Sequence, residues 1–134
     1  DIITPHPGEA ARLLATTTTD IQADRFAAAT ALQDKFGSSV VLKGAGSLVQ
    51  AAGSVPAVIG AGNPGMGVGG MGDVLTGVIA ALRGQGFAAP AAATIGALLH
   101  AAAGDAAALD DGERGLLPSD LLPWLRRLAN PVRR

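Results

Sequence analysis

The segment from Gly62 to Gly77 constrains this chain more than any other, because it joins a dense glycine cluster to the start of a helix. Six glycines fall within the eleven residues from Gly62 to Gly72, Asp73 follows at once, and an apolar helical pattern begins. Glycine clusters provide positive φ angles or a close approach of the backbone to a ligand. A glycine loop that opens into a helix directs free N–H groups and the positive end of the helix dipole toward one point. The segment therefore predicts an anion-binding site with a carboxylate beside it.

The loop matches neither of the two common phosphate-binding motifs. A Walker loop requires a lysine after its last glycine, and no lysine follows here. Gly65, Gly67 and Gly70 satisfy Gly-x-Gly-x-x-Gly, but no acidic residue stands about twenty positions further on, as the dinucleotide motif requires. The alternative to a phosphate site is a flexible glycine-rich turn capped by Asp73.

The composition narrows the classes of function. The chain has 134 residues, enough for one domain, and its net charge of −1 argues against electrostatic binding of nucleic acid. It contains no cysteine, which excludes disulfides, thiolate metal sites and cysteine nucleophiles. Hydrophobic residues make up 49 % of the chain, but Gly, Pro, His and Asp interrupt the alanine-rich runs. We therefore expect no signal peptide, no membrane span and a cytoplasmic location.

Hydrophobic spacing and turn residues predict an α/β protein whose strands are mostly apolar throughout. A hairpin turn is expected at residues 44–46. Asp20 is the expected N-cap of a long helix that Gly37 ends, and the threonine run 16–19 is interpreted as a linker. The expected strands are residues 2–3, 39–42, 47–49 and 55–59. The expected helices are residues 8–14, 20–36, 71–84, 88–109 and 118–129.

The first residues predict how the chain relates to a whole domain. The chain starts with Asp1-Ile2-Ile3-Thr4, which has the pattern of the end of a buried strand and carries no initiator methionine. We therefore expect residues 1–134 to be the C-terminal portion of a single larger domain, without its N-terminal portion. We also expect these residues alone to be a poor enzyme and a marginal fold, because a sheet cut between strands exposes an unpaired edge.

Four segments together share one family resemblance. The first is Thr4–Glu9, the second is Val41–Ser47, the third is Asn63–Leu75, and the fourth consists of pieces between His100 and Leu122. In this order they resemble the substrate turn, the nucleotide hairpin, the anion hole with its catalytic loop, and the closing helices of the ADP/ATP-dependent NAD(P)H-hydrate dehydratases. This family lies within the ribokinase-like superfamily. The Gly-Gly-x-Gly-Asp core alone would also fit sugar and vitamin kinases.

The resemblance implies a fold, a reaction and partners. The fold is ribokinase-like and layered, with a mixed central sheet flanked by helices, of which this chain is the C-terminal half. ADP or ATP transfers a phosphoryl group to the hydroxyl of hydrated NADH or NADPH, and elimination of phosphate restores NAD(P)H, which is a metabolite repair. ADP is favoured, with Mg²⁺ held by phosphates and water rather than by protein ligands. A homo-oligomer of the full-length protein and fusion to, or association with, an NAD(P)H-hydrate epimerase are also expected.

The resemblance also implies roles for individual residues. Asp73 is the expected catalytic base and shares substrate binding with His6. The expected nucleotide-binding residues are Lys43, Gly44, Ala45, Gly46, Ser47 and Gly72. The expected anion hole consists of Gly69, Gly70, Met71 and Gly72. Two positions depart from the family pattern, since Gly67-Val68 stands where relatives often carry Ala-Thr, and Ser47 where they often carry Thr.

Other interpretations of the same residues remain open at this stage. A small-molecule kinase of the same superfamily would share Asp73 and the anion hole, but it would need neither the His6 turn nor the lead-in Asn63–Gly65. A non-catalytic nucleotide-binding module is the third class of function. Individually, His6 and Lys43 could be ordinary surface residues, and His100 a packed or capping histidine.

Overall fold

The computed structural model describes residues 1–130, so the last four residues of the predicted domain, 131–134, lie outside the described residues. Four strands form one mixed sheet in the order β1 (Ile2–Ile3), β2 (Ser39–Leu42), β3 (Ser47–Gln50) and β4 (Ala57–Ile59). β1 pairs in parallel with β2, whereas the β2–β3 and β3–β4 pairs are antiparallel. β1, β2 and β4 therefore run in one direction, and their carboxyl ends meet at the same end of the sheet.

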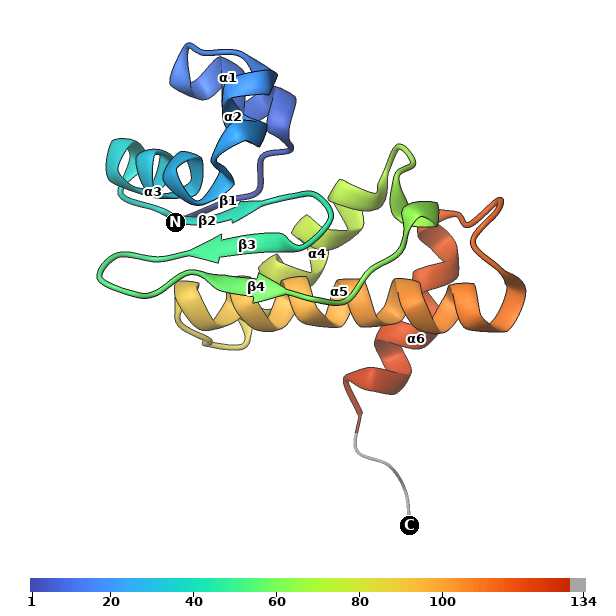
Figure 1. Cartoon of the computed structure of the whole chain (residues 1–134). Coiled ribbons are helices and arrows are strands. Elements are labelled where there is room, and N and C mark those ends of the chain that lie inside the picture. Colours follow the sequence, from blue (N-terminus) through green and yellow to red (C-terminus); the bar gives the residue numbers. More distant parts are fainter. Residues whose placement is uncertain (131–134) are drawn as a thin grey trace.

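Helices cover both faces of this sheet (Figure 1). On one face lie α1 (Pro7–Leu14), α2 (Thr18–Ala23) and α3 (Arg25–Phe36). On the other face lie α4 (Met71–Gly84) and α5 (Ala89–Asp111). The result is a three-layer arrangement of helices, sheet and helices, which confirms the predicted α/β class with a mixed sheet.

Three shorter pieces complete the described chain. The 3₁₀ turn η1 (Pro64–Met66) lies between β4 and α4, and a second turn, η2 (Pro118–Asp120), leads into α6 (Leu121–Leu128). α6 packs against the C-terminal half of α5 through Leu121, which is fully buried beside Ala103 and Ala107. The end of α5 is thereby covered on the side away from the sheet.

The strands are apolar throughout because successive side chains enter two different cores. Val40 and Leu42 of β2 pack with α1, α2 and α3, whereas Val41 packs with α4 and α5. Leu48 and Val49 of β3 divide between the two cores in the same way. Every residue of β2 is buried, as expected for a strand covered by helices on both faces.

The long helix predicted over residues 20–36 is wrong, because the chain forms two helices there. Thr17 begins α2, since its hydroxyl accepts the Asp20 N–H while the Asp20 carboxylate accepts the Thr17 N–H. Asp24 then leaves the helical region, with φ −147° and ψ 88°, and its carboxylate caps α3 by accepting the Ala27 N–H. The threonine run is therefore the start of a helix and not a linker. Gly37 ends α3 as predicted, with φ 60°.

Other boundaries also differ from the prediction, most of them by one or two residues. The strand predicted over residues 55–59 begins at Ala57, because Val55 is 90 % exposed and Pro56 has no N–H to donate to the ladder. The helix predicted over residues 118–129 divides into η2 and α6, since the Leu121 N–H bonds to the Pro118 carbonyl with 3₁₀ spacing. The hairpin at residues 44–46 is confirmed by the antiparallel β2–β3 pair.

Helix α5 is both long and apolar. Of the described helices, it is the one that is long and apolar enough to cross a membrane by length and composition alone. Half of its most apolar window is buried in the fold, where it packs on the sheet, α4 and α6. Its composition is therefore accounted for by its place as a core helix.

Candidate functional site

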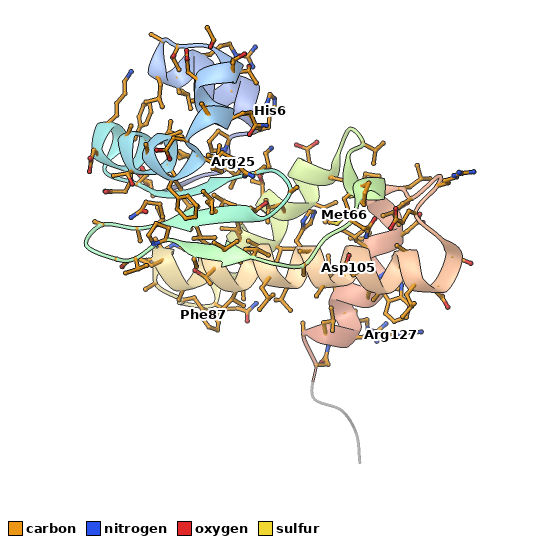
Figure 2. The ribbon with its side chains drawn as sticks, viewed as in Figure 1. His6, Arg25, Met66, Phe87, Asp105 and Arg127 are labelled. Atoms are coloured by element: carbon orange, nitrogen blue, oxygen red, sulfur yellow. The ribbon has the colours of Figure 1, made fainter. Side chains whose placement is uncertain are left out.

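A cavity of about 750 Å³ opens at the carboxyl ends of β1, β2 and β4. Ligands of open α/β sheets bind at this end of the strands. The walls come from the turn after β1, the β2–β3 hairpin, the loop between β4 and α4, the start of α4 and the middle of α5. His6 and Met66, labelled in Figure 2, belong to two of these walls.

Most of the predicted site residues line this one cavity, although they come from three separate parts of the sequence. Those in its lining are His6, Lys43, Gly44, Ala45, Gly46, Ser47, Met71 and Gly72. The fold therefore brings the predicted substrate turn, the predicted nucleotide hairpin and the start of α4 to the same place.

Three predicted residues lie beside the cavity rather than in its lining. Gly70 is the N-cap of α4, with φ 93°, and Pro118 packs over it. Asp73 is in the first turn of α4, where its side chain is exposed and accepts no hydrogen bond from the described residues. No hydrogen bond within the described chain uses the N–H groups of Gly69, Gly70 or Gly72. These amides are available to a ligand, as an anion hole requires.

Lys43 brings a positive charge to the start of α4. Its ammonium lies so close to Gly72 that a Cβ added to this glycine would be 2.8 Å from the Lys43 Nζ. The ammonium and the positive end of the α4 dipole therefore act on the same region. A side chain at position 72 would displace the end of the Lys43 side chain from this place.

His6 has one ring nitrogen committed to the fold. Its Nδ1 accepts the N–H groups of Gly8 and Glu9, at 3.1 and 3.2 Å, and thereby caps α1. Since Nδ1 accepts, the neutral ring carries its hydrogen on Nε2, which lies 3.6 Å from the Oε1 of Glu9. Only the Nε2 edge of His6 is left for a ligand in the cavity.

Glu9 connects the two predicted binding segments, although the sequence singled it out only as part of a motif. Its Oε2 accepts the His6 N–H at 2.8 Å and lies 3.8 Å from the Nζ of Lys43. The hydrogen bond from the His6 backbone lowers the pKa of Glu9, against an opposing effect of burial, and the charge of Lys43 lowers it further.

His100 of α5 forms part of the cavity floor. Its Nε2 donates to the carbonyl oxygen of Met71 at 2.9 Å, since that oxygen can only accept. Burial lowers the pKa of His100, the bond to Met71 opposes this, and the nearby Lys43 lowers it further. The ring ties α5 to the start of α4, which agrees with its interpretation as a packed histidine.

Asp105 holds the loop that forms another wall of the cavity. Its two carboxylate oxygens accept the Gly62 N–H at 2.8 Å and the Asn63 Nδ2 at 3.0 Å. Asn63 in turn accepts the Gly65 N–H through its side-chain oxygen. In the sequence, Asp105 stood out only because it lies within the fourth segment of the family resemblance, between His100 and Leu122.

The described residues do not provide a metal site of their own. They contain no group of three or more His, Asp or Glu side chains placed to hold a metal ion. Glu9 is engaged by His6 and Lys43, and Asp73 lies outside the cavity lining. The Mg²⁺ expected from the resemblance therefore has no protein ligand set in this part of the chain.

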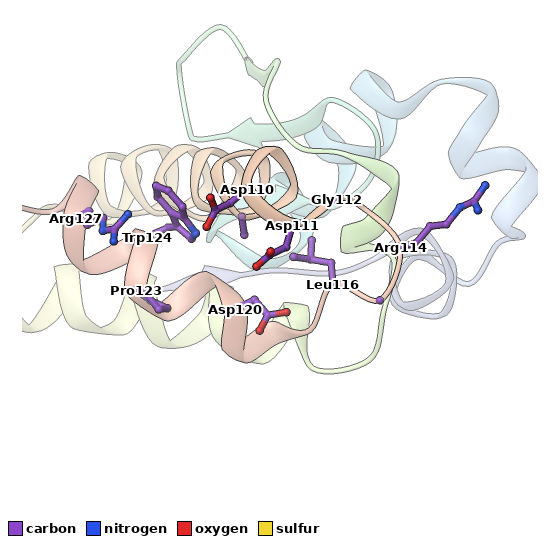
Figure 3. A pocket seen from close by; sticks show the side chains of 11 residues that line it. Asp110, Asp111, Gly112, Arg114, Leu116, Asp120, Pro123, Trp124 and Arg127 are labelled. Atoms are coloured by element: carbon purple, nitrogen blue, oxygen red, sulfur yellow. The ribbon is translucent and has the colours of Figure 1, made fainter.

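A second cavity, of about 250 Å³, lies between the end of α5 and α6 (Figure 3). Two of its charged groups have local structural contacts: Asp120 accepts the Leu117 N–H, and Arg127 stacks over the ring of Trp124 at 4.5 Å. The Arg114 side chain points away from the other labelled residues (Figure 3). No predicted site residue lines this cavity, so the candidate site is the larger one.

The chain is similar to known proteins over nearly its whole length. A family model described as NAD(P)H-hydrate dehydratase matches residues 1–127. The chain is 55 % identical to the bifunctional NAD(P)H-hydrate repair enzyme of Vibrio cholerae, over 96 % of this chain and 26 % of that protein. It is 45 % identical to the ADP-dependent (S)-NAD(P)H-hydrate dehydratase of Neisseria meningitidis, over 98 % of this chain and 45 % of that protein.

A solved structure shows the same fold. The ADP/ATP-dependent NAD(P)H-hydrate dehydratase of Bacillus subtilis, co-crystallised with ATP and Mg²⁺, superposes with a TM-score of 0.87 at 27 % identity, over 95 % of this chain and 46 % of that one. The chain thus spans between a quarter and a half of the length of these relatives. The predicted ribokinase-like fold is confirmed, and the chain belongs to the NAD(P)H-hydrate dehydratase family.

Proposed function

We propose that the protein carrying this chain dehydrates hydrated NADH or NADPH, with ADP or ATP as the phosphoryl donor. The observation that carries the proposal is the meeting of His6, the hairpin from Lys43 to Ser47 and the start of α4 around one cavity. A nucleotide on the hairpin and a substrate at the His6 turn would both lie within reach of the N–H groups that begin α4. The ADP-dependent relative from Neisseria meningitidis supports ADP as the donor.

In the proposed reaction, the described residues supply the groups for the phosphoryl transfer. Asp73 takes the proton from the substrate hydroxyl, whose oxygen then attacks the terminal phosphorus of ADP and releases AMP. The free N–H groups of Gly69, Gly70 and Gly72, with the ammonium of Lys43, stabilise the charge on the phosphoryl oxygens in flight. Phosphate then leaves with the electrons of the C–O bond, and loss of a proton from the neighbouring ring carbon restores the dihydropyridine.

Asp73 is exposed in the described chain, so its role requires a substrate that covers it. Phosphoryl transfer depends mainly on positioning and on donors for the moving charge.

The resemblance also implies a homo-oligomer, a cytoplasmic location and an epimerase partner. The bifunctional relative from Vibrio cholerae supports a second repair activity in the same protein.

The test uses the full-length protein with chemically hydrated NADH and with ADP, ATP or AMP. Return of the dihydropyridine absorbance with ADP or ATP, together with equal amounts of released phosphate, is the expected result. Phosphorylation of a sugar or vitamin precursor without repair of the hydrate would favour the kinase alternative. Nucleotide binding without any turnover would favour the non-catalytic module.

A further inference from the structure

We propose that Arg25 is a positioning residue for the nucleotide, because its guanidinium holds the β2–β3 hairpin in a shape that leaves the Gly46 N–H free for the ligand. This inference rests on the proposed function, in which the hairpin binds ADP or ATP. Arg25 is the first residue of α3, outside all four segments that carry the family resemblance. Figure 2 shows it where α3 begins, on the side of the sheet covered by α1, α2 and α3.

The guanidinium makes three hydrogen bonds to the backbone at this turn. Its Nη1 donates to the carbonyl oxygen of Ala45 at 2.7 Å, and its Nη2 donates to those of Leu42 at 3.1 Å and Lys43 at 3.3 Å. The Nε is buried and has no partner in the described part of the chain. The polar contacts of Arg25 among the described residues are therefore all to the hairpin, and a side chain 17 to 20 positions earlier in the sequence fixes its shape.

These bonds set the direction of the peptide groups in the turn. In a planar trans peptide the carbonyl and the following N–H point in opposite directions. Because the carbonyls of Lys43 and Ala45 point at the guanidinium, the N–H groups of Gly44 and Gly46 point away from it. The Gly44 N–H donates to the Ser47 hydroxyl at 3.3 Å, whereas no described group accepts the Gly46 N–H.

The hairpin stands between Arg25 and the cavity. Residues Lys43 to Ser47 belong to the cavity lining, and Arg25 does not. The guanidinium therefore contacts the carbonyl groups on the side of the turn that faces away from the cavity. The side toward which the N–H groups point is left for a ligand. The Gly46 N–H on this side has no acceptor among the described residues and suits a phosphate oxygen or another acceptor atom of a nucleotide.

Gly44 provides a second view of the same contact. It has φ +150°, and a Cβ added there would lie 2.8 Å from the Arg25 Nη2. The turn therefore packs directly on the guanidinium, with no space for a side chain between them. Gly44→Ala should push the guanidinium away from its carbonyl acceptors without substituting Arg25, and it also strains the backbone of the turn at this positive φ.

The test compares Arg25→Met, Arg25→Lys and Arg83→Met in the full-length protein. Arg83 is the matched control, because it also donates to a carbonyl, that of Phe87, but at the far end of α4. Titration calorimetry gives the ADP affinity, steady-state kinetics give KM for ADP and for hydrated NADH, and thermal unfolding gives stability. Arg25→Met should weaken ADP binding by about 10- to 100-fold, the range for one lost charged hydrogen bond. KM for hydrated NADH should not change.

The remaining variants keep the inference open to refutation. Arg25→Lys keeps the positive charge but not the planar, forked set of N–H donors of the guanidinium. Its ADP affinity should therefore lie between those of the wild type and Arg25→Met. Should Arg25→Met fail to fold, Gly44→Ala should show the same selective loss of ADP affinity. The inference would be overturned if Arg25→Met and Arg83→Met lost equal stability while ADP affinity stayed intact. It would also be overturned if Arg25→Met weakened the binding of ADP and of hydrated NADH equally.

The outcome also separates this inference from the proposed function. A wild-type protein that neither binds ADP or ATP nor repairs the hydrate would refute the proposed function, and Arg25 would then have no nucleotide to position. An active wild-type protein whose ADP affinity does not depend on Arg25 or on Gly44 would refute only the inference.

Discussion

The ammonium of Lys43 lies 3.8 Å from the Oε2 of Glu9, and this ion pair joins the β2–β3 hairpin to the turn that carries His6. The same ammonium lies against Gly72 at the start of α4. Lys43 is thus shared between a carboxylate and the helix end at which we propose that phosphate binds. Glu9 would compete with a phosphate for the lysine, so its charge should tune the affinity of the site.

Glu9→Gln should strengthen ADP binding by up to about fivefold, because a half-exposed ion pair is worth roughly 0.2–1 kcal/mol. Glutamine still offers an oxygen to the His6 N–H, so the cap of α1 is kept while the negative charge is removed. Calorimetry at low and high salt measures the effect, which should shrink as salt screens the charges. Asp34→Asn, on the exposed face of α3, is the control for a simple change of net charge. Weaker binding of ADP to Glu9→Gln would contradict the proposed competition.

Substitutions of His6 can separate its two ring nitrogens. His6→Ala removes both the cap of α1 and the Nε2 edge, so it should lower the free energy of unfolding by about 1 kcal/mol and raise KM for the hydrate. His6→Asn keeps a capping oxygen, so stability should return while KM stays high. Denaturant unfolding and steady-state kinetics of the two variants measure this. A collapse of kcat at saturating substrate would instead make His6 a catalytic residue.

The sequence predicted the local elements well wherever one residue decides a boundary. Gly37 ends α3 through its left-handed conformation, and the glycines at 44 and 46 mark the hairpin. The break at Asp24 escaped prediction because the apolar spacing of residues 21–36 continues across it, whereas the backbone there turns to extended angles. The start of α2 did have a signal in the sequence, since Thr17 and Asp20 form a capping box, whereas Asp20 was the expected N-cap and residues 16–19 the expected linker.

Residues of the candidate site could be predicted where they stand together in a motif, and could not be predicted where their contacts cross the fold. Lys43, Gly72 and His6 were identified from their own segments, and the fold places them at one cavity. Arg25 gave no signal, since an arginine at the start of a helix has many uses and its carbonyl acceptors lie on β2 and in the hairpin. Only tertiary structure could reveal its contacts.

Asp73→Asn should lower nucleotide-dependent dehydration by about 10²- to 10⁴-fold, the range for a positioned acid–base group. Asparagine keeps the size of the side chain but cannot take the proton of the substrate hydroxyl. ADP affinity, measured by calorimetry, should change little, because Asp73 lies outside the cavity lining. Asp110→Asn, an exposed carboxylate near the end of α5, serves as control. Near-normal turnover of Asp73→Asn would exclude Asp73 as the base.

Asp105→Asn should destabilise the loop between β4 and α4. The carboxylate accepts two donors, the Gly62 N–H and the Asn63 Nδ2, whereas an asparagine would point an NH₂ group at one of them. A buried donor left without an acceptor costs about 1–3 kcal/mol, and Asp105 is half-buried, so we expect the lower part of this range. Urea unfolding measures the loss, with Asp111→Asn as the exposed control on the same helix. Equal stability of the two variants would show that the loop does not depend on Asp105.

The partly buried His100 should make the free energy of unfolding depend on pH in the range just below neutrality. Burial lowers its pKa in the folded state, whereas in the unfolded chain a histidine titrates near about 6.5. Between the two pKa values the unfolded state binds more protons, so the free energy of unfolding rises with pH. The contribution of His100 is therefore complete above about pH 6.5 and is lost as the pH falls through the folded-state pKa.

Urea unfolding of the wild type and of His100→Gln over this pH range isolates the effect. Glutamine can still donate to the Met71 carbonyl but does not titrate, so the difference in stability between the two proteins should narrow as the pH falls. Other groups, including Glu9 and Asp20 with their lowered pKa values, titrate in both proteins and cancel in the difference. A difference that stays constant from neutral pH down to about 5 would mean that His100 accepts a proton as readily in the fold as in the unfolded chain, against its burial between α5 and the start of α4.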